Sequence, residues 1–158
     1  MVAARRLLLA AFAVALLLPI PSAHADLAKW DQAKVTALGD QLAAAAKNLQ
    51  DVFYNHPPAT VGSGQSRDYQ RLKQTLRRLR MEADQLKGDL GKGAGQEETL
   101  PQYEDVMMSV RDAREVANRL FTTQDMKDAA SQARAVLNQL APYYDPDAVP
   151  LQPVPSMR

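Results

Sequence analysis

The segment YQRLKQTLRRLRMEADQLKGDL, residues 69–90, decides the fold class of this chain. Its large apolar residues recur at alternating steps of three and four, the spacing that places them on one side of an α-helix. The residues in this register are Tyr69, Leu72, Leu76, Leu79, Ala83, Leu86 and Leu90. We predict a helix over about residues 66–88, with Ser66 as its N-cap and the glycines from Gly88 onward at its end.

Three further segments show the same apolar spacing. The apolar positions run from Val35 to Val52 in the first, from Tyr103 to Leu120 in the second and from Met126 to Tyr144 in the third. They predict helices over about residues 27–54, 100–121 and 123–141. Because each predicted helix has one apolar side, the four bury these sides only by packing together. We therefore expect an all-α fold over residues 26–141, an antiparallel four-helix bundle with up-down-up-down topology.

Capping residues support the boundaries of the last two predicted helices. Thr99 is placed to cap the third helix, with Gln102 three residues later to complete a capping box. Thr122 is placed to cap the fourth, with Asp125 three residues later. Pro142 is expected to end that helix, because proline interrupts helical hydrogen bonds.

Residues 1–25, MVAARRLLLAAFAVALLLPIPSAHA, are typical of a secretory signal peptide. They combine a basic start, an apolar run over residues 7–18 and small residues at Ala23 and Ala25. The run is shorter than the roughly 20 residues that a membrane-spanning helix needs. We predict cleavage after Ala25, export to the bacterial periplasm or exterior, and no transmembrane segment in the mature chain. The alternatives are an uncleaved membrane anchor and a twin-arginine signal.

The composition of the rest of the chain excludes several kinds of site. No cysteine is present, which excludes disulfides, thiolate metal sites and cysteine nucleophiles. After residue 25 the chain carries 17 basic and 18 acidic residues, so its net charge indicates no particular partner. Residues 142–158 contain five prolines and few large apolar residues, which predicts an extended or disordered tail.

The ligands of a buried cofactor are scarce. Four-helix bundles of bacterial periplasms often hold haem or paired iron, and a di-iron site needs Glu-x-x-His on two helices, which does not occur here. His56, the only histidine after residue 25, lies in a predicted loop and is expected to be solvated. Met107 and Met108 are adjacent, so they point about 100° apart on a helix and cannot share a copper ion. We expect no metal or other cofactor.

Motifs of common enzymes are also missing. Lys92 stands between two glycines but is not followed by Ser or Thr, and a helix rather than a strand is predicted before it, so it does not form a phosphate loop. A serine triad would have to use His56, and no Gly-x-Ser-x-Gly turn is present. We therefore predict no enzymatic activity.

The most distinctive charge feature is RLKQTLRRLR, residues 71–80, which has five basic residues and no acid. These residues are Arg71, Lys73, Arg77, Arg78 and Arg80. In one interpretation they pair with acids of neighbouring helices, such as Glu104, Asp105 and Asp112. In the other they form a docking surface for an anionic envelope component or an acidic protein. Nucleic acid is not expected, because export separates the protein from it and the run lacks interleaved aromatic residues.

These features together predict an exported, non-enzymatic four-helix bundle that acts through its surface as an envelope binding or chaperone-like protein. Its partner is an unidentified protein or an anionic envelope component, and a homo-oligomer is possible. The alternative is a bundle that binds a small cofactor or metal in its core.

Overall fold

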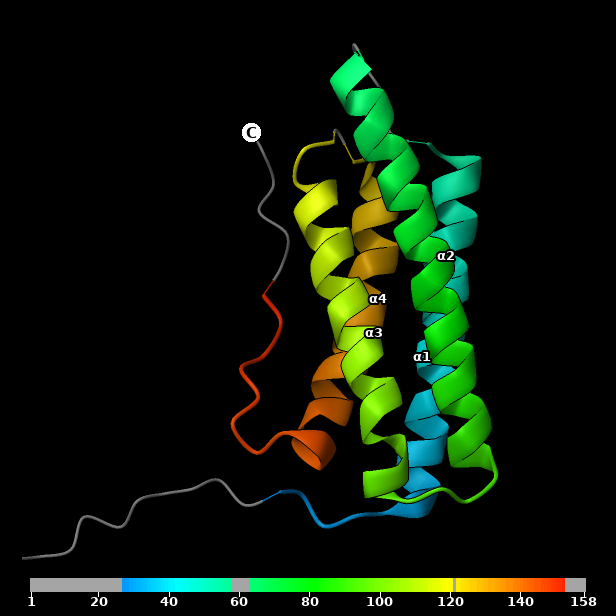
Figure 1. Ribbon diagram of the computed structural model, residues 1–158, viewed down its shortest axis with the longest axis vertical. Coiled ribbons are helices and arrows are strands. Elements are labelled where there is room, and N and C mark those ends of the chain that lie inside the picture. The colour runs from blue at the N-terminus through cyan, green and yellow to red at the C-terminus, as the bar shows by residue number, and fades with distance from the viewer. Residues whose placement is uncertain (1–26, 58–62, 121, 153–158) are drawn as a thin grey trace, which may run out of the picture.

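The structure is a computed structural model that describes residues 27–57, 63–120 and 122–152 (Figure 1). The described residues form four helices and no strand: α1 (Gln32–Asn55), α2 (Ser63–Gly91), α3 (Gln96–Ala117) and α4 (Gln124–Tyr144). The predicted all-α fold with four helices is confirmed. The predicted signal peptide, residues 1–25, lies outside the described residues. Within the described ranges, no helix combines the length and hydropathy that a membrane span requires.

The apolar register of residues 69–90 is the buried side of α2. Its members from Leu72 to Leu90 are between 0 and 3% exposed. Tyr69 is half-buried and stacks on Phe53 of α1, with ring centroids 4.9 Å apart. Buried residues of all four helices join these side chains in one hydrophobic core. The spacing of the apolar residues therefore predicted the correct buried side of α2.

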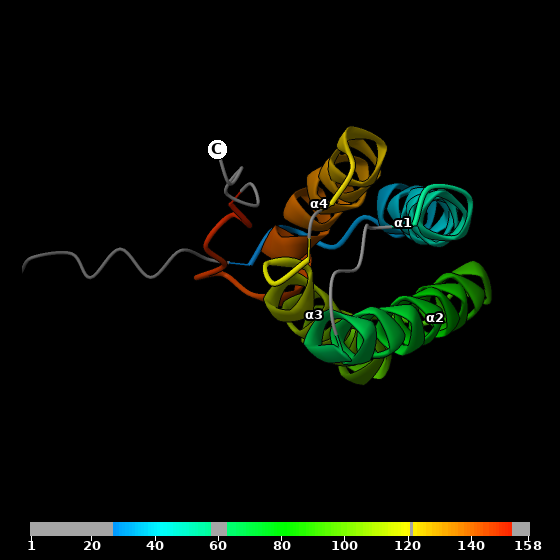
Figure 2. The same cartoon turned by 90° about the horizontal axis from the view of Figure 1, so that it is seen from above.

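The four helices pack closely on three sides and loosely on the fourth (Figure 2). α1 packs against α2 and α4, and α2 packs against α3, whereas α3 and α4 touch each other much less. α1 and α2 approach closely at Gly39, where a Cβ atom would lie 2.8 Å from Leu90 Cδ1 and 3.6 Å from the Cα of Lys87. The fold is thus least closed between α3 and α4.

Contacts between helix ends hold neighbouring helices in register. Gln32 Nε2, at the start of α1, donates a hydrogen bond to the Leu90 carbonyl near the end of α2, at 3.1 Å. At the start of α3, the Thr99 hydroxyl lies 2.9 Å from the Tyr144 hydroxyl at the end of α4. The Tyr144 ring also stacks on Tyr103, with centroids 4.3 Å apart. The start of α1 therefore lies against the end of α2, and the start of α3 against the end of α4.

The segment before α1 is not helical, in contrast to the prediction of a helix from about residue 27. α1 begins at Gln32 because the Asp31 carboxylate accepts a hydrogen bond from an amide of the first turn, at 3.1 Å. The Ala28 amide instead donates to the Pro142 carbonyl at 2.8 Å. This backbone bond attaches residues 27–31 to the end of α4.

Other helix ends also differ from the prediction. α2 extends beyond residues 66–88 at both ends. α3 begins before residue 100 with Gly95 as its N-cap, so Thr99 is a buried residue inside the helix and not a cap. α4 is capped by Thr123 rather than Thr122. Several neighbouring residues are able to cap each of these helices, and contacts with other helices decide which one does. Thr99 is an example, because its hydroxyl lies against the Tyr144 hydroxyl of α4 inside the fold.

The end of α4 is a further correction, because Pro142 does not stop the helix. α4 continues to Tyr144, and both Tyr143 and Tyr144 are buried. Their rings meet the edge of Trp30, with centroid distances of 6.2 and 5.7 Å. Packing of these three aromatic rings offsets the helical hydrogen bond that proline cannot donate. The predicted tail therefore does not begin at residue 142.

Candidate ligand-binding site

The five basic residues of the run at 71–80 do not form one free surface. Arg78 Nη2 lies 2.6 Å from the Asp112 carboxylate of α3, and Arg78 Nε lies 3.6 Å from Glu82. Arg78 Nε also donates a hydrogen bond to the buried Ser109 hydroxyl at 2.9 Å. For Arg78, this is the pairing with an acid of a neighbouring helix that the first interpretation of the run predicts.

Lys73 and Arg80 lie on the side of α2 that faces α1. The ammonium group of Lys73 lies 5.4 Å from the centroid of the Tyr54 ring, a cation–π contact. Arg80 donates a hydrogen bond to Gln50 Oε1 at 3.0 Å and lies 3.7 Å from the Asp84 carboxylate. Both side chains are therefore engaged within the protein.

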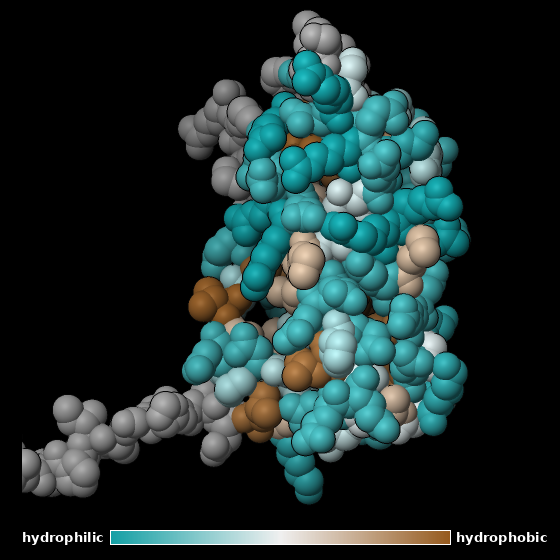
Figure 3. Space-filling view, in the orientation of Figure 1, coloured by the Kyte–Doolittle hydropathy of each residue, from teal (hydrophilic) through white to brown (hydrophobic). Residues whose placement is uncertain are grey.

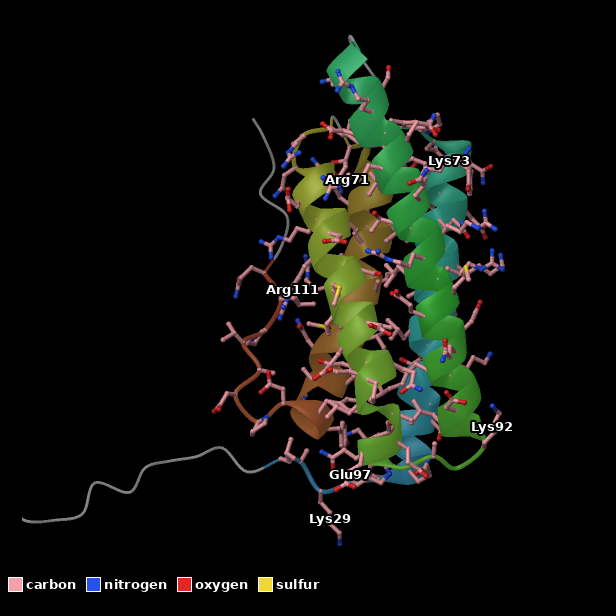
Figure 4. All side chains as sticks on the ribbon, in the orientation of Figure 1. Lys29, Arg71, Lys73, Lys92, Glu97 and Arg111 are labelled. Carbon is pink, nitrogen blue, oxygen red and sulfur yellow. The ribbon has the colours of Figure 1, made fainter. Side chains whose placement is uncertain are left out.

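Arg71 and Arg77 are the remaining members of the run. Both are exposed, and no ion pair among the described residues includes either of them. Figure 4 shows Arg71 and Lys73 on different sides of α2. The structure thus leaves two separate arginines, rather than a continuous stripe, for an external anion.

The residues considered as cofactor ligands are also dispersed. His56 Nδ1 lies 3.3 Å from the Asp125 carboxylate, and both side chains are more than half exposed. Met107 is half-buried against the core, and Met108 is 57% exposed. Within the described part of the chain, no three His, Cys, Asp or Glu side chains form a group suited to a metal ion.

A groove between α3 and α4 reaches into the hydrophobic core. Its cavity has a volume of about 110 Å³. Its floor consists of core leucines of α1 and α2, which are Leu49, Leu72, Leu76 and Leu79. Its walls carry short side chains, which are Ala113 and Ala117 of α3 and Ala130 and Ala133 of α4. The groove therefore borders core residues, which are themselves buried, at the place where the helix packing is loosest.

The groove results from short side chains between two helices that larger groups hold apart. At one end, the stacked rings of Tyr103 and Tyr144 lie between α3 and α4. At the other end, the connection from residue 118 to residue 123 joins the two helices. Between these ends, the alanine methyl groups do not fill the space between the helices, because an alanine side chain is much smaller than a leucine side chain.

The C-terminal segment, residues 145–152, reaches the groove with its last two residues. The Leu151 amide donates a hydrogen bond to the Asn138 side-chain oxygen at 2.9 Å, and the Leu151 side chain packs against the core. Leu151 and Gln152 both line the groove. In the space-filling view, apolar side chains reach the surface beside a hollow on this side of the molecule (Figure 3). Residues 145–152 contain no helix or strand, which agrees with the extended alternative of the predicted tail, and residues 153–158 lie outside the described residues.

The charged groups at the groove are all cations. Arg114 of α3 and Lys127 and Arg134 of α4 line it, and no carboxylate does so among the described residues. All three are half-buried. Arg134 donates a hydrogen bond to the Ser131 hydroxyl at 2.8 Å, but none of the three takes part in an ion pair with another described residue. The site thus combines an apolar interior with a positive rim.

The stacked rings of Tyr103 and Tyr144, which lie outside the groove lining, are uncharged at neutral pH. Burial raises the pKa of Tyr103 to about 12, and the nearby negative charge of Asp145 adds to this effect. Burial also raises the pKa of Tyr144, while its hydrogen bond with Thr99 acts in the opposite direction. The two stacked phenols therefore act as core packing groups between α3 and α4 rather than as acid or base groups.

Sequence reasoning missed the groove. The alanines at its walls belong to the predicted apolar registers of the last two helices, where they read as ordinary core residues. The available signal was the combination of short residues on two consecutive helices with flanking cations, which are Arg114, Lys127 and Arg134.

Comparison with known proteins assigns the chain to no family. No protein-family model, no curated protein and no solved structure matches it. The function is therefore inferred from the groove and its surroundings.

Proposed function

We propose that the protein is an exported, non-enzymatic binding protein, an antiparallel four-helix bundle with up-down-up-down topology that holds an apolar ligand between α3 and α4. The signal-peptide pattern of residues 1–25 supports export to the periplasm or the exterior of a bacterium. The contacts of Gln32 with Leu90 and of Thr99 with Tyr144 support the antiparallel topology. The observation that carries the binding role is the groove, because it leads from the surface to the core leucines.

The composition of the groove favours a small apolar ligand. Ligand sites are typically concave and largely apolar, with a few polar groups that orient the ligand. Each methylene group that moves from water into such a site contributes about 0.8 kcal/mol. A ligand with several methylene groups would therefore gain several kcal/mol from contact with side chains such as Leu76 and Leu137.

The groove is a better candidate site than the basic run of α2. Arg78, Lys73 and Arg80 of that run contact other groups of the protein, so their charges are partly balanced within the fold. Exposed ion pairs of this kind contribute little to binding or stability, about 0 to 1 kcal/mol each. Docking of an anionic envelope component on the exposed residues Arg71 and Arg77 is the second candidate function.

A neutral fluorescent probe tests the proposed function. N-phenyl-1-naphthylamine, with one ring in the cavity and the others along its open side, should bind the purified protein saturably, at one molecule per chain, with a rise in fluorescence. Ala130→Leu fills the groove and should weaken this binding by about tenfold or more. Ala135→Leu is the matched control, because Ala135 is an exposed residue of the same helix.

Three outcomes would contradict the proposed function. The first is no saturable binding to the parent protein, and the second is equal binding to Ala130→Leu and the parent. The third is a stable homodimer that hides the groove, which would appear in light scattering and would exclude the probe.

A chaperone-like role for unfolded polypeptide would appear as competition of the probe with an unfolded protein but not with small apolar molecules.

A further inference from the structure

We infer that the ligand of the α3–α4 groove is the anion of a medium-chain fatty acid, with its chain on the core leucines and its carboxylate among Arg114, Lys127 and Arg134. This inference rests on the proposed function and names the ligand class of the same site. It follows from three properties of the groove, which are its charge, its volume and its length.

The charge of the rim favours an anionic head group. The three cations line an apolar groove, are half-buried and have no carboxylate partner among the described residues. Partly desolvated cations gain from a nearby anion, and arginine binds a carboxylate through two parallel hydrogen bonds. The carboxylate of a fatty acid is a small head group that supplies the negative charge, whereas the head group of an alcohol or an amine carries no negative charge.

The volume of the cavity favours a single short chain. A cavity of about 150 Å³ in another protein holds one benzene molecule, which has six carbon atoms. The groove here has about 110 Å³ with Leu151 in place, so it buries about half of an eight-carbon chain and leaves the rest along its open side. A lipid with two chains exceeds this space.

The length of the groove agrees with an extended chain. Met126 and Leu137 both line it, and about 16 Å of α4 separates them at about 1.5 Å per residue. An extended chain advances about 1.2 Å per bond, so eight to ten carbons occupy about half to two thirds of this distance. Lys127 and Arg134 lie seven residues apart on the α4 wall. A ligand carboxylate therefore meets a cation at either of these two positions along the groove.

Competition against the neutral probe tests this inference. Octanoate should displace N-phenyl-1-naphthylamine at about tenfold lower concentration than octan-1-ol, because a charge-assisted hydrogen bond adds to the same apolar contact. Octylammonium should be weaker than octan-1-ol, since it meets cations at the rim. All three compounds contain eight carbon atoms, and octanoate has the shorter alkyl part, so a preference for octanoate comes from its head group.

Removal of the rim charges provides the second arm. In Arg114→Gln/Lys127→Gln/Arg134→Gln, the probe should still bind with little change, while the preference for octanoate over octan-1-ol should be lost. Arg71→Gln/Arg77→Gln is the matched control, because it removes exposed charges that do not line the groove and should keep the preference. If the triple variant does not fold, Arg114→Gln alone should still reduce the preference by about threefold or more.

The outcomes separate the two proposals. Absence of probe binding contradicts the proposed function itself. Probe binding with equal displacement by octanoate and octan-1-ol overturns only the fatty acid inference, as does a preference that survives in the triple variant. A lysophosphatidic acid with an eight-carbon chain that displaces the probe at lower concentration than octanoate would also overturn it, because it would assign the rim to a phosphate head group.

Discussion

The main-chain amide of Leu151 donates a hydrogen bond to the side-chain oxygen of Asn138, 2.9 Å away, and this bond holds the C-terminal segment against α4. The Leu151 side chain is half-buried and packs on the core at the mouth of the groove. One hydrogen bond and one apolar side chain therefore hold the end of a proline-rich segment at the site. Such an attachment is weak, because a single hydrogen bond contributes about 0.5 to 1.5 kcal/mol.

Loss of this hydrogen bond should loosen the C-terminal segment without unfolding the protein. We expect Asn138→Ala to lower the free energy of unfolding by about 1 kcal/mol and to accelerate dissociation of the bound neutral probe, measured by stopped-flow fluorescence. Gln139→Ala is the control, because the exposed Gln139 side chain donates a hydrogen bond to the Ala135 carbonyl of its own helix. Equal dissociation rates for Asn138→Ala and the parent would show that the segment does not cover the ligand.

The register of α2 predicts a large difference between two adjacent residues. Leu79 is 3% exposed, so Leu79→Asp buries an unpaired carboxylate and should cost several kcal/mol of a total stability of about 5 to 15 kcal/mol. Arg78→Ala removes the contacts with Asp112 and Ser109 and should cost about 1 kcal/mol. Urea denaturation measures both values. A stable Leu79→Asp variant would refute the register.

Gly39 and Gly88 provide a matched pair of glycines. A Cβ at Gly39 would meet Leu90 Cδ1 at 2.8 Å, and Gly39→Val would also press on the α2 backbone, so it should cost about 1 to 3 kcal/mol. A Cβ at Gly88 would have no neighbour within 4 Å, so Gly88→Ala should stabilise the helix by up to about 1 kcal/mol. Thermal unfolding followed by circular dichroism compares the two. A destabilised Gly88→Ala variant together with an unchanged Gly39→Val variant would contradict the packing of α1 on α2.

Local sequence pattern predicted the fold class and the buried side of α2, because both depend on the spacing of apolar residues along one helix. Leu72 and Leu86 are buried in any bundle that covers this side. Helix ends were predicted less well, because they depend on contacts with other helices. Thr99 looks like a cap in the sequence, but its hydroxyl lies against Tyr144, 45 residues away in the chain.

The groove depends on packing that the sequence pattern does not contain. Alanine suits a tight contact between two helices and also the wall of an open groove, so Ala113 and Ala130 are compatible with both. The five prolines after residue 141 indicate disorder by composition, and composition does not reveal that Leu151 finds an amide acceptor on Asn138. The candidate site was therefore visible only after the four helices were in place.

The stacked tyrosines predict a loss of stability at alkaline pH. Because burial raises the pKa of Tyr103 to about 12 from 10.0, the folded state favours the neutral phenol. This contribution is complete below pH 10 and is lost as the pH rises from 10 towards 12, by at most about 2 to 3 kcal/mol. Tyr103→Phe should remove this part of the pH dependence, measured by urea denaturation between pH 8 and pH 11. Tyr54→Phe is the control, because Tyr54 is exposed. An unchanged slope of the free energy of unfolding against pH in Tyr103→Phe would contradict the burial of the Tyr103 hydroxyl.

Processing of the chain has a direct test. We predict that the secreted protein begins at Asp26, because small residues at Ala23 and Ala25 precede it. Intact mass spectrometry of the protein from the extracellular or periplasmic fraction should show the loss of residues 1–25. A membrane-bound species that retains these residues would support the uncleaved anchor.

Nuclear magnetic resonance of alanine methyl groups tests the central claim, ligand binding between α3 and α4, most directly. With ¹³C-labelled alanine methyl groups, titration with octan-1-ol should produce saturable shifts at the groove walls, which are Ala113, Ala117, Ala130 and Ala133. The methyl groups of the exposed residues Ala44 and Ala135 should not shift. Saturable shifts confined to the four groove alanines are the predicted result. No shift at these four, or equal shifts at all alanines, would contradict the account.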